Sequence, residues 1–254
     1  MSTRADEQVR ADIVEVGRRL YTRGFVASND GNISARLDDH RLVTTPKSVS
    51  KGFMTPDMMV IVDYEGRKVT GDRDPSSELP MHLEIYRNRP DVNAVVHAHP
   101  PTATGFAAAG VALNQPLVCE VVIGLGSIPL AKYGTPGTPE LTDALAPLVP
   151  NYDALLMSNH GVVTYGTDLS QAFMKMETVE HFARIALVTH QLGRQQPLAG
   201  EDLEKLVGVR EKYLGGTQPI VPEPAGSKNG NKRKRTADGV EAVTEDLRRR
   251  RISQ

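Results

Sequence analysis

The segment from residue 76 to residue 99 constrains the fold most, because it joins an amphipathic helix directly to an apolar strand. In SSELPMHLEIYRNRPD, apolar residues recur at helical spacing at Leu79, Leu83 and Tyr86, and Pro90 marks the end of the helix. The following run, NAVVHAH, is rich in small and β-branched residues and predicts a strand. Together they predict an α/β chain in which helices cover a sheet.

The same two periodicities recur along the chain. Helical spacing predicts further helices over residues 9–20, 105–109, 138–149, 172–190 and 201–213. Thr138 is the expected cap of one of them, and Ser76 or Ser77 caps the helix described above. Short β-type runs predict strands over residues 33–37, 42–45, 59–62 and 127–133, and two strands within 153–166. Turn residues separate several of these runs, which favours a sheet built from hairpins.

Composition indicates the setting in which this fold works. The chain has 254 residues, of which 39% are hydrophobic, and this predicts one main domain. No apolar run is long enough to cross a bilayer, and the first residues are charged, so we expect a soluble, cytoplasmic protein without a membrane partner. Cys119 is the single cysteine, so any metal must be held by His, Asp or Glu.

The composition changes near residue 219. From Pro219 onward Pro, Gly, Asn, Lys and Arg dominate, and residues 228–251 contain nine of the thirty basic residues against four acidic ones. Such a segment cannot bury enough apolar surface to offset its ordering entropy. We therefore expect a catalytic domain over residues 1–218 and a disordered basic tail over 219–254.

Two histidines, His97 and His99, lie one residue apart at the end of the predicted strand. Alternate strand residues share a face, so the two imidazoles point the same way. Polar residues also close strands without binding anything, so the pair alone does not define a site. Glu78 and His160, which lies in the polar turn SNHG, complete a set of three imidazoles and one carboxylate. That set suits Zn²⁺ or another divalent ion such as Mn²⁺ or Co²⁺.

Donors suited to an anion are predicted beside Glu78. Ser76 and Ser77 lie at the start of a helix, where free backbone N–H groups and the helix dipole favour a phosphate or carboxylate. Further donors come from three polar side chains: Asn32, Lys47 and Ser48. Each residue has a simpler alternative role as a helix cap, a turn residue or a solvated charge. Their position next to Glu78 favours a pocket that orients a phosphorylated sugar or a keto acid for Lewis-acid chemistry.

Four blocks, in this order and separation, resemble the class II aldolase/adducin family: GNIS, VTTPKSVSKG, PSSELPMHLEIYRNRPDVNAVVHAHPPTATGFA and LLMSNHGVVTYG. The resemblance extends from about Ala11 to about Tyr213, and the combination of Ser-Ser-Glu, His-X-His and Asn-His-Gly is specific. It implies a three-layer α/β/α fold with a central, mainly antiparallel sheet. It also implies a homo-oligomer, with a tetramer as the first expectation.

The resemblance also implies roles for individual residues. The implied zinc ligands are Glu78, His97, His99 and His160, and the implied phosphate ligands include Asn32, Ser76 and Ser77. Glu78 and Tyr213 are the implied catalytic residues: Glu78 leaves the metal to act as acid and base, and Tyr213 covers or protonates the departing aldehyde. The implied reaction cleaves a ketose 1-phosphate to dihydroxyacetone phosphate and an aldehyde through a metal-bound enediolate.

Departures from the family pattern leave the substrate open. Where aldolases of this family read Thr-Pro-Thr-Gly, this chain reads Thr-Pro-Lys-Ser, which adds a charge at Lys47 and removes a glycine at Ser48. A metal-dependent decarboxylase of a keto acid or sugar-acid phosphate is therefore an alternative. The family's inter-subunit tyrosine is missing, with Glu120 and Tyr133 as candidates to replace it. No acidic residue follows His-X-His in the way the family's epimerases use one, so aldolase is favoured over epimerase.

One further interpretation competes with this assignment. The family also includes adducins, so the chain can be a non-catalytic interaction protein, with nucleic acid reached only through the basic tail. The complete Glu-His set argues for an enzyme. His82 lies one helical turn after Glu78, and we interpret it as a packed or solvent-reaching helix residue and not as a ligand.

Overall fold

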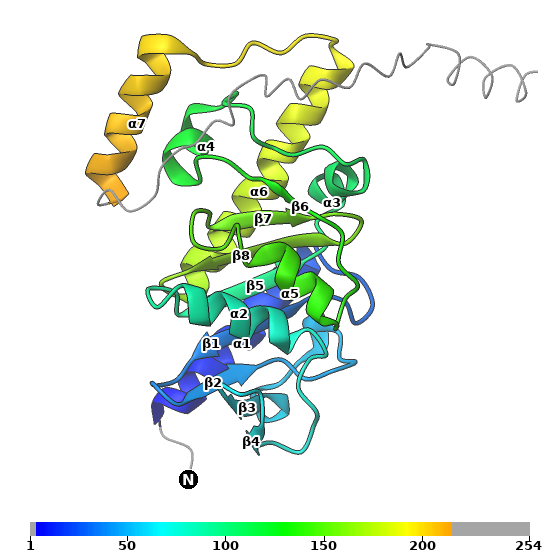
Figure 1. Cartoon of the computed structure of the whole chain (residues 1–254). Helices are drawn as coiled ribbons and strands as arrows, with labels where there is room; N and C mark the ends of the chain where they lie inside the picture. The colour runs from blue at the N-terminus through cyan, green and yellow to red at the C-terminus, as the bar shows by residue number, and fades with distance from the viewer. Residues whose placement is uncertain (1–3, 215–254) are drawn as a thin grey trace, which may run out of the picture. The chain divides into compact units, whose positions relative to one another are not determined.

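The computed structural model describes residues 4–214 (Figure 1). The helices are α1 (Arg4–Thr22), α2 (Leu79–Asn88), α3 (Pro101–Ala108), α4 (Cys119–Gly124), α5 (Pro139–Leu145), α6 (Leu169–Gln191) and α7 (Gly200–Leu214), with 3-10 turns at Lys51–Phe53 and Pro56–Met58. The strands are β1 (Asn32–Arg36), β2 (Arg41–Thr44), β3 (Val60–Asp63), β4 (Lys68–Thr70), β5 (Ala94–Ala98), β6 (Leu130–Ala131), β7 (Ala154–Met157) and β8 (Gly161–Gly166).

The strands form one eight-stranded sheet in the order β4-β3-β2-β1-β5-β8-β7-β6. Every neighbouring pair is antiparallel except β6 and β7, which are parallel. Hairpins of neighbouring strands account for β1 to β4 and for β7 with β8, as their turn residues predicted. The predicted α/β class and mainly antiparallel sheet are confirmed.

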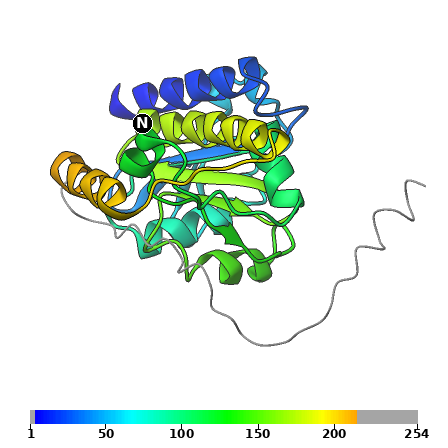
Figure 2. The ribbon, with the colours of Figure 1, turned by 90° about the horizontal axis from the view of Figure 1, so that it is seen from above.

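Helices cover both faces of this sheet. One buried cluster joins a sheet face to α1, α3, α4 and α6, and a second joins the opposite face to α2 and α5. In Figure 2, α1 and α6 lie side by side on one side of the sheet, and α2 and α5 lie on the other. These are the three layers expected from the family resemblance.

The central strand β5 shows how the sequence pattern becomes two cores. Ala94, Val96 and Ala98 belong to the cluster under α1, α3 and α6, whereas Val95 belongs to the cluster under α2 and α5. His97 has the same parity as Val95, so its side chain faces the α2 layer. Each fully buried branched side chain contributes about 1.5–3 kcal/mol to stability, so a one-residue register shift is strongly disfavoured.

Two local expectations were wrong, and one helix was missed. The strand expected over residues 127–133 is only β6, Leu130–Ala131, because the backbone joins the sheet for just two residues beside β7. α4 was not expected at all. The helix after the paired serines begins at Leu79, with Glu78 at its N-cap position, so neither serine is the cap. Ser76 instead accepts a hydrogen bond from the Glu78 backbone N–H at 3.3 Å.

Two expectations concern regions or properties outside this core. The predicted tail over residues 219–254 lies outside the described residues. Within residues 4–214, no helix combines the length and apolarity that a membrane span requires.

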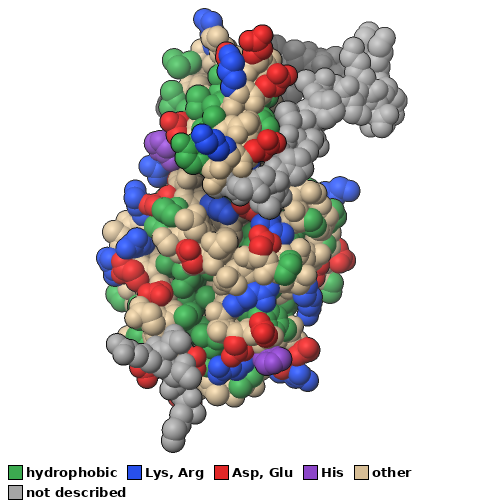
Figure 3. Space-filling view, turned by 90° about the vertical axis from the view of Figure 1, so that its left-hand side faces the viewer, with side chains coloured by type: hydrophobic (Ala, Val, Ile, Leu, Met, Phe, Trp, Pro, Cys, Tyr) green, Lys and Arg blue, Asp and Glu red, His purple; other side chains and the backbone are tan. Residues whose placement is uncertain are grey.

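The face in Figure 3 carries acidic and basic side chains interspersed, so this face presents no continuous block of positive charge.

Candidate active site

The end of β5 fixes the first two imidazoles. His97 is fully buried, and its Nδ1–H donates to the carbonyl of Val162 on the neighbouring strand β8 at 2.8 Å. His99 follows the strand, and its Nδ1 lies 2.9 Å from a carboxylate oxygen of Asp30, to which it donates. A carbonyl and a carboxylate can only accept, so in each neutral ring Nε2 carries the lone pair. The two Nε2 atoms lie 3.1 Å apart.

The turn between β7 and β8 supplies the third imidazole. Asn159 adopts a left-handed conformation, with φ of 56°, which asparagine tolerates better than most residues. The next residue, His160, donates its backbone N–H to Met157 and closes the turn. The ring centroid of His160 lies 4.7 Å from that of His97 and 5.2 Å from that of His99. The three ligating atoms lie within 4.8 Å of one another.

Glu78 reaches this triad from the start of α2. One of its oxygens lies 3.2 Å from His97 Nε2, and the other lies 3.1 Å from His160 Nε2. Burial raises the pKa of Glu78, but the charges and hydrogen bonds of His97 and His160 outweigh burial and hold the pKa well below its usual range. Glu78 is therefore ionised at neutral pH and faces the imidazoles as a carboxylate.

The donor set fits a divalent ion. Ligand atoms at about 2.0–2.1 Å from a tetrahedral ion are about 3.3 Å from one another. The distances from His97 Nε2 to His99 Nε2 and to Glu78, and from Glu78 to His160 Nε2, are 3.1–3.2 Å. The His97 and His99 lone pairs point at each other, and repulsion between them is relieved by a cation. Glu78 Oε1 is also buried and makes no well-aligned hydrogen bond, although His160 Nε2 lies 3.1 Å from it. Burial lowers the pKa of His97 and the charge of Glu78 more than offsets this, which is a further sign that the cluster attracts positive charge.

A glycine makes room for the rings. A Cβ at Gly161, directly after His160, would lie 2.4 Å from His99 Cδ2, 2.7 Å from the carbonyl oxygen of Ala98 and 3.3 Å from His97 Cε1. The Asn-His-Gly block therefore supplies a ligand and, in its glycine, the space that the other two ligands occupy. This close approach is the physical reason for a glycine at this position.

The predicted anion ligands line one cavity of 210 Å³ beside the triad. Its lining includes Asn32, Lys47, Ser48, Ser76 and Ser77, together with Glu78 and His99. Backbone pairing brings the two sequence blocks together: Lys47 N–H donates to Asp74 O at 2.9 Å, and Ser76 N–H donates to Thr45 O at 3.2 Å. Every substrate-binding residue predicted from the sequence thus lies at this cavity.

Within that cavity the side chains differ in their freedom. Lys47 and Ser77 are exposed, and Ser48 has a left-handed backbone with φ of 59°. Asn32 is 3% exposed, and its amide donates to Glu78 at 2.7 Å. An amide nitrogen carries two hydrogens, so Asn32 has one donor left for an anion after binding Glu78.

The structure does not bring Tyr213 into this cavity. Tyr213 lies on α7, is 76% exposed and lines a different pocket with Arg89, Asp153 and Arg210. The two candidates for the missing inter-subunit tyrosine are also elsewhere: Glu120 lines a pocket with His181, and Tyr133 is exposed. None of these three residues lines the 210 Å³ cavity.

Three functional neighbours were missed or undervalued from the sequence. Asp30 orients His99, and its signal was its place directly before the Gly-Asn turn. Lys51 is buried at 2% exposure and donates to the carbonyl of Val49 and to that of Asn29, which lines the anion cavity. His82 is buried, as expected of a packed residue, but hydrogen-bonds to Asn32.

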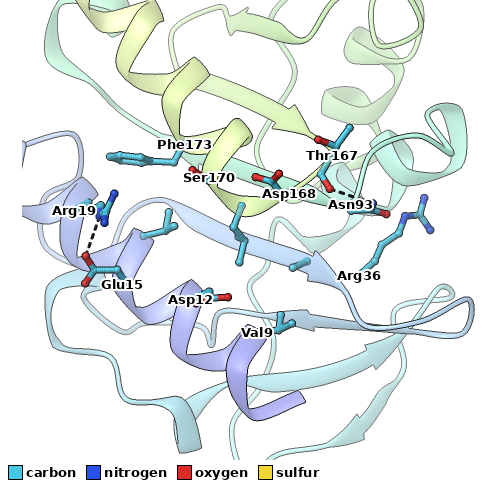
Figure 4. A pocket seen from close by; sticks show the side chains of 13 residues that line it. Val9, Asp12, Glu15, Arg19, Arg36, Asn93, Thr167, Asp168, Ser170 and Phe173 are labelled. Atoms are coloured by element: carbon cyan, nitrogen blue, oxygen red, sulfur yellow. Dashed lines mark hydrogen bonds and ion pairs between the residues drawn. The ribbon is translucent and has the colours of Figure 1, made fainter. Parts of the chain in front are cut away.

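A larger pocket lies elsewhere, between α1, β1 and the start of α6 (Figure 4). It has a volume of 480 Å³ and is lined by Glu15, Arg19, Arg36 and Asp168 among others, with Glu15 and Arg19 paired at 2.9 Å. Asp168 is already engaged as the cap of α6, accepting from the Gln171 N–H. None of the predicted site residues lines this pocket, so pocket size does not identify the chemistry.

Known proteins share both sequence and fold with this chain. Residues 11–187 match the family described as class II aldolase and adducin N-terminal domain. The 5-deoxy-D-ribulose 1-phosphate aldolase of Bacillus thuringiensis serovar kurstaki is 34% identical over 209 residues, covering 82% of this chain and 97% of that protein. The 3-oxo-tetronate 4-phosphate decarboxylase of Pectobacterium atrosepticum is 33% identical over 191 residues, covering 74% and 87%.

A solved structure agrees with these relatives. An L-fuculose 1-phosphate aldolase superposes with a TM-score of 0.76 and 28% identity, covering 84% of this chain and 98% of that one. The family match over residues 11–187 includes Glu78 and the three histidines, with the strands and helices that position them. The chain therefore belongs to the class II aldolase and adducin family.

Proposed function

We propose that this chain is a divalent-metal lyase, with zinc as the first candidate ion, that cleaves a ketose 1-phosphate to dihydroxyacetone phosphate and an aldehyde. One observation carries the proposal: the anion cavity lined by Ser76, Ser77 and Lys47 is also lined by Glu78 and by His99, one member of the histidine triad. A phosphate held by the first group places the adjoining carbonyl carbon beside the second. A scaffold protein without catalysis needs no such juxtaposition.

The ion would be held by His97, His99 and His160, with Glu78 as a fourth ligand that substrate can displace. When bound, it supplies Lewis-acid stabilisation of the negative charge that develops on the substrate oxygens during cleavage. The remaining work falls to the protein: binding the phosphate, orienting the carbon skeleton and moving protons.

The phosphate binds at the start of α2. Ser76 and Ser77 offer hydroxyl donors, Lys47 offers a charge, and Asn32, which also lines the cavity, has one amide hydrogen beyond the one it donates to Glu78. Charge-assisted hydrogen bonds of this kind are roughly twice as strong as neutral ones. They fix one end of the substrate, so the bond that breaks is set by its distance from the phosphate.

Glu78 has the position to move the proton. In the cleavage direction, the hydroxyl next to the scissile bond gives its proton to the Glu78 carboxylate, the carbon–carbon bond breaks, and an aldehyde leaves. The bonding electrons remain on the retained three-carbon fragment as an enediolate. Glu78, once protonated, delivers a proton to the carbon that lost its partner, which gives dihydroxyacetone phosphate and balances the reaction.

A decarboxylase is the second candidate, and its chemistry converges on the same fragment. Loss of carbon dioxide from a 3-oxo-tetronate 4-phosphate, the substrate in the name of one relative, leaves the same enediolate and then dihydroxyacetone phosphate. The retained phosphate would use the same pocket. Lys47 favours this alternative, because it adds a positive charge to a cavity that then receives a substrate with a carboxylate as well as a phosphate.

The departing group needs a partner that one chain does not place at the cavity. Tyr213 remains our candidate for protonating or covering the aldehyde, and its position on α7 means that another copy of the chain would have to present it. We therefore propose a homo-oligomer, with a tetramer as the first arrangement to test. Metabolites of this phosphorylated class are cytoplasmic, and we place the enzyme there.

The test measures both halves of the products. The protein, loaded with zinc, is incubated with a panel of ketose 1-phosphates and, separately, with 3-oxo-tetronate 4-phosphate. Dihydroxyacetone phosphate is followed in both, because both reactions release it, and aldehyde and carbon dioxide are measured in parallel. Aldehyde formation that chelator abolishes supports the aldolase, whereas carbon dioxide formation alone transfers the assignment to the decarboxylase. Absence of both, in protein that contains one metal per chain, contradicts the lyase.

A further inference from the structure

A continuous row of polar side chains runs from the interior of the protein to Glu78. Its members are Tyr86, Ser34, His82 and Asn32, with exposed fractions of 2%, 0%, 1% and 3%. The function proposed above uses only Asn32 of these four. Polar groups are rarely kept in such a place without complete hydrogen bonding, so the row calls for a physical explanation.

Two elements place these residues opposite each other. On β1, Asn32 and Ser34 are two positions apart and so face the same side of the sheet. On α2 and its N-cap, Glu78, His82 and Tyr86 are spaced by four residues and lie on one helix face. The spacing of two on the strand matches the spacing of four on the helix, which is why each strand side chain finds a helix partner.

The hydrogen bonds of the row have one direction, and the carboxylate decides it. Glu78 can only accept, so the Asn32 atom at 2.7 Å from it is the amide nitrogen. The Asn32 oxygen then faces His82 Nε2 at 2.5 Å, so Nε2 carries the proton and donates.

Beyond the ring, the same direction continues. His82 Nδ1 is bare and accepts from the Ser34 hydroxyl at 2.6 Å, and Ser34 accepts from the Tyr86 hydroxyl at 2.9 Å. Each donor points toward Glu78, and the ring is a single neutral tautomer.

Burial agrees with a neutral ring. Burial lowers the pKa of His82 to about 3, with a smaller effect from the charge of His97 in the same direction. A neutral imidazole is both donor and acceptor, which is what a position between an amide oxygen and a hydroxyl requires. An imidazolium would instead donate to Ser34, which would then turn its own hydrogen toward Tyr86 and reverse this part of the row.

We propose that His82 is a positioning residue for Glu78: it holds the amide of Asn32 in the one orientation that presents a donor to the carboxylate. This rests on the proposed function in one respect, namely that Glu78 binds the ion and acts on the substrate. Without the His82 donor, the Asn32 amide is free to turn its oxygen toward Glu78, and the carboxylate then loses a hydrogen bond and gains a repulsive neighbour. Substitution of residues that orient metal ligands through hydrogen bonds typically lowers metal affinity by about 10- to 100-fold.

Two substitutions separate positioning from mere packing. Glutamine has the same number of bonds from Cβ to its amide nitrogen as histidine has to Nε2, so His82→Gln retains a donor for Asn32. Asparagine matches Nδ1 instead, so His82→Asn retains a partner for Ser34 and loses the donor for Asn32. Ser34→Ala is the matched control, because it breaks the row behind His82 and leaves the His82–Asn32 contact in place.

Zinc affinity is measured by competition with a chelating dye, and stability by urea unfolding of the metal-free proteins. We expect His82→Asn to weaken zinc binding about 10- to 100-fold, and His82→Gln and Ser34→Ala to stay within about threefold of the unchanged protein. Near-normal zinc affinity in folded His82→Asn overturns the proposal, and so does equal weakening in His82→Gln and His82→Asn.

A second measurement uses the unchanged protein and needs neither a substrate nor any variant. Nitrogen chemical shifts of the His82 ring in the metal-free protein report its tautomer directly. A ring protonated on Nε2 supports the proposal, and a neutral ring protonated only on Nδ1 overturns it. Failure of the unchanged protein to bind zinc would contradict the proposed function, and the tautomer would still decide the role of His82.

Discussion

The candidate site has two parts that are built differently, the metal cluster and the anion cavity. The cluster residues His97 and His160 sit at strand ends beside the buried face of the sheet, and Val162 and Asp30 fix the rings of His97 and His99. The anion cavity is built from loops, and its charged residue Lys47 is exposed. The rigid part fits a reaction step shared by relatives with different substrates, and the open part fits the choice among those substrates.

The largest effect is expected at the rigid part. His97→Ala removes a fully buried side chain that we propose as a metal ligand, and with it the charge stabilisation that a bound ion would supply. We expect turnover to fall by about 10³-fold or more, which corresponds to about 4 kcal/mol in the barrier. Steady-state kinetics and metal analysis of the same sample check this.

His181→Ala is the matched control, because His181 is an exposed histidine on α6 that lines another pocket. A His97→Ala protein that turns over normally while containing no metal would contradict the cluster's role.

The next effect is expected at the open part. Ser77→Ala removes one hydroxyl donor and Lys47→Ala removes one charge, and hydrogen bonds to charged groups are worth about 1.5–3 kcal/mol. We expect KM for a phosphorylated substrate to rise about 10- to 100-fold with unchanged zinc affinity.

Ser170→Ala, at an exposed serine in the pocket of Figure 4, is the control for a lost hydroxyl. If Ser77→Ala weakened zinc binding by as much as it raised KM, the metal cluster and the anion cavity would not be separable.

A smaller effect is expected where the backbone makes room for the rings. Gly161→Ala places a methyl group against His99 and the Ala98 carbonyl, and overpacking of this kind costs about 1–3 kcal/mol. We expect zinc affinity to fall about tenfold, because the His99 ring must move.

Gly105→Ala is the matched control, since a Cβ there meets no atom within 4 Å. Equal zinc affinities in the two variants, measured by dye competition, would show that the cluster tolerates movement of the ring.

The smallest effect is a pH dependence of the free energy of unfolding that comes from the buried Lys51. Burial lowers the pKa of Lys51 to about 8 from the ordinary 10.5, partly offset by the charge of Asp30. Between these values the unfolded chain binds more protons than the folded chain, so the free energy of unfolding rises with pH. We expect a gain of about 1 kcal/mol between pH 8 and pH 9 from this group.

Urea unfolding at both pH values measures this gain, and Lys51→Met should lack it. Identical pH slopes for the two proteins would mean that Lys51 is charged in the folded state throughout this range.

Much of the fold could be predicted from local pattern. Helical spacing identified α1, α2, α5, α6 and α7, because each repeats apolar residues on one face, and in α1, α2, α5 and α6 that face is buried. Alternation in NAVVHAH assigned Val95 and His97 to one face, since strand geometry leaves no other choice. β6 was overextended, because its pairing depends on where β7 ends and not on its own residues.

The candidate site divides along the same line. The sequence by itself determined the candidate metal ligands, because residue type and position at a helix start or strand end are local properties of Glu78, His97 and His160. The tertiary structure alone decided that Asp30 and His82 orient this set and that Tyr213 lies at another pocket of the chain. Those facts depend on contacts between segments distant in sequence, and only strand register and helix packing bring such segments together.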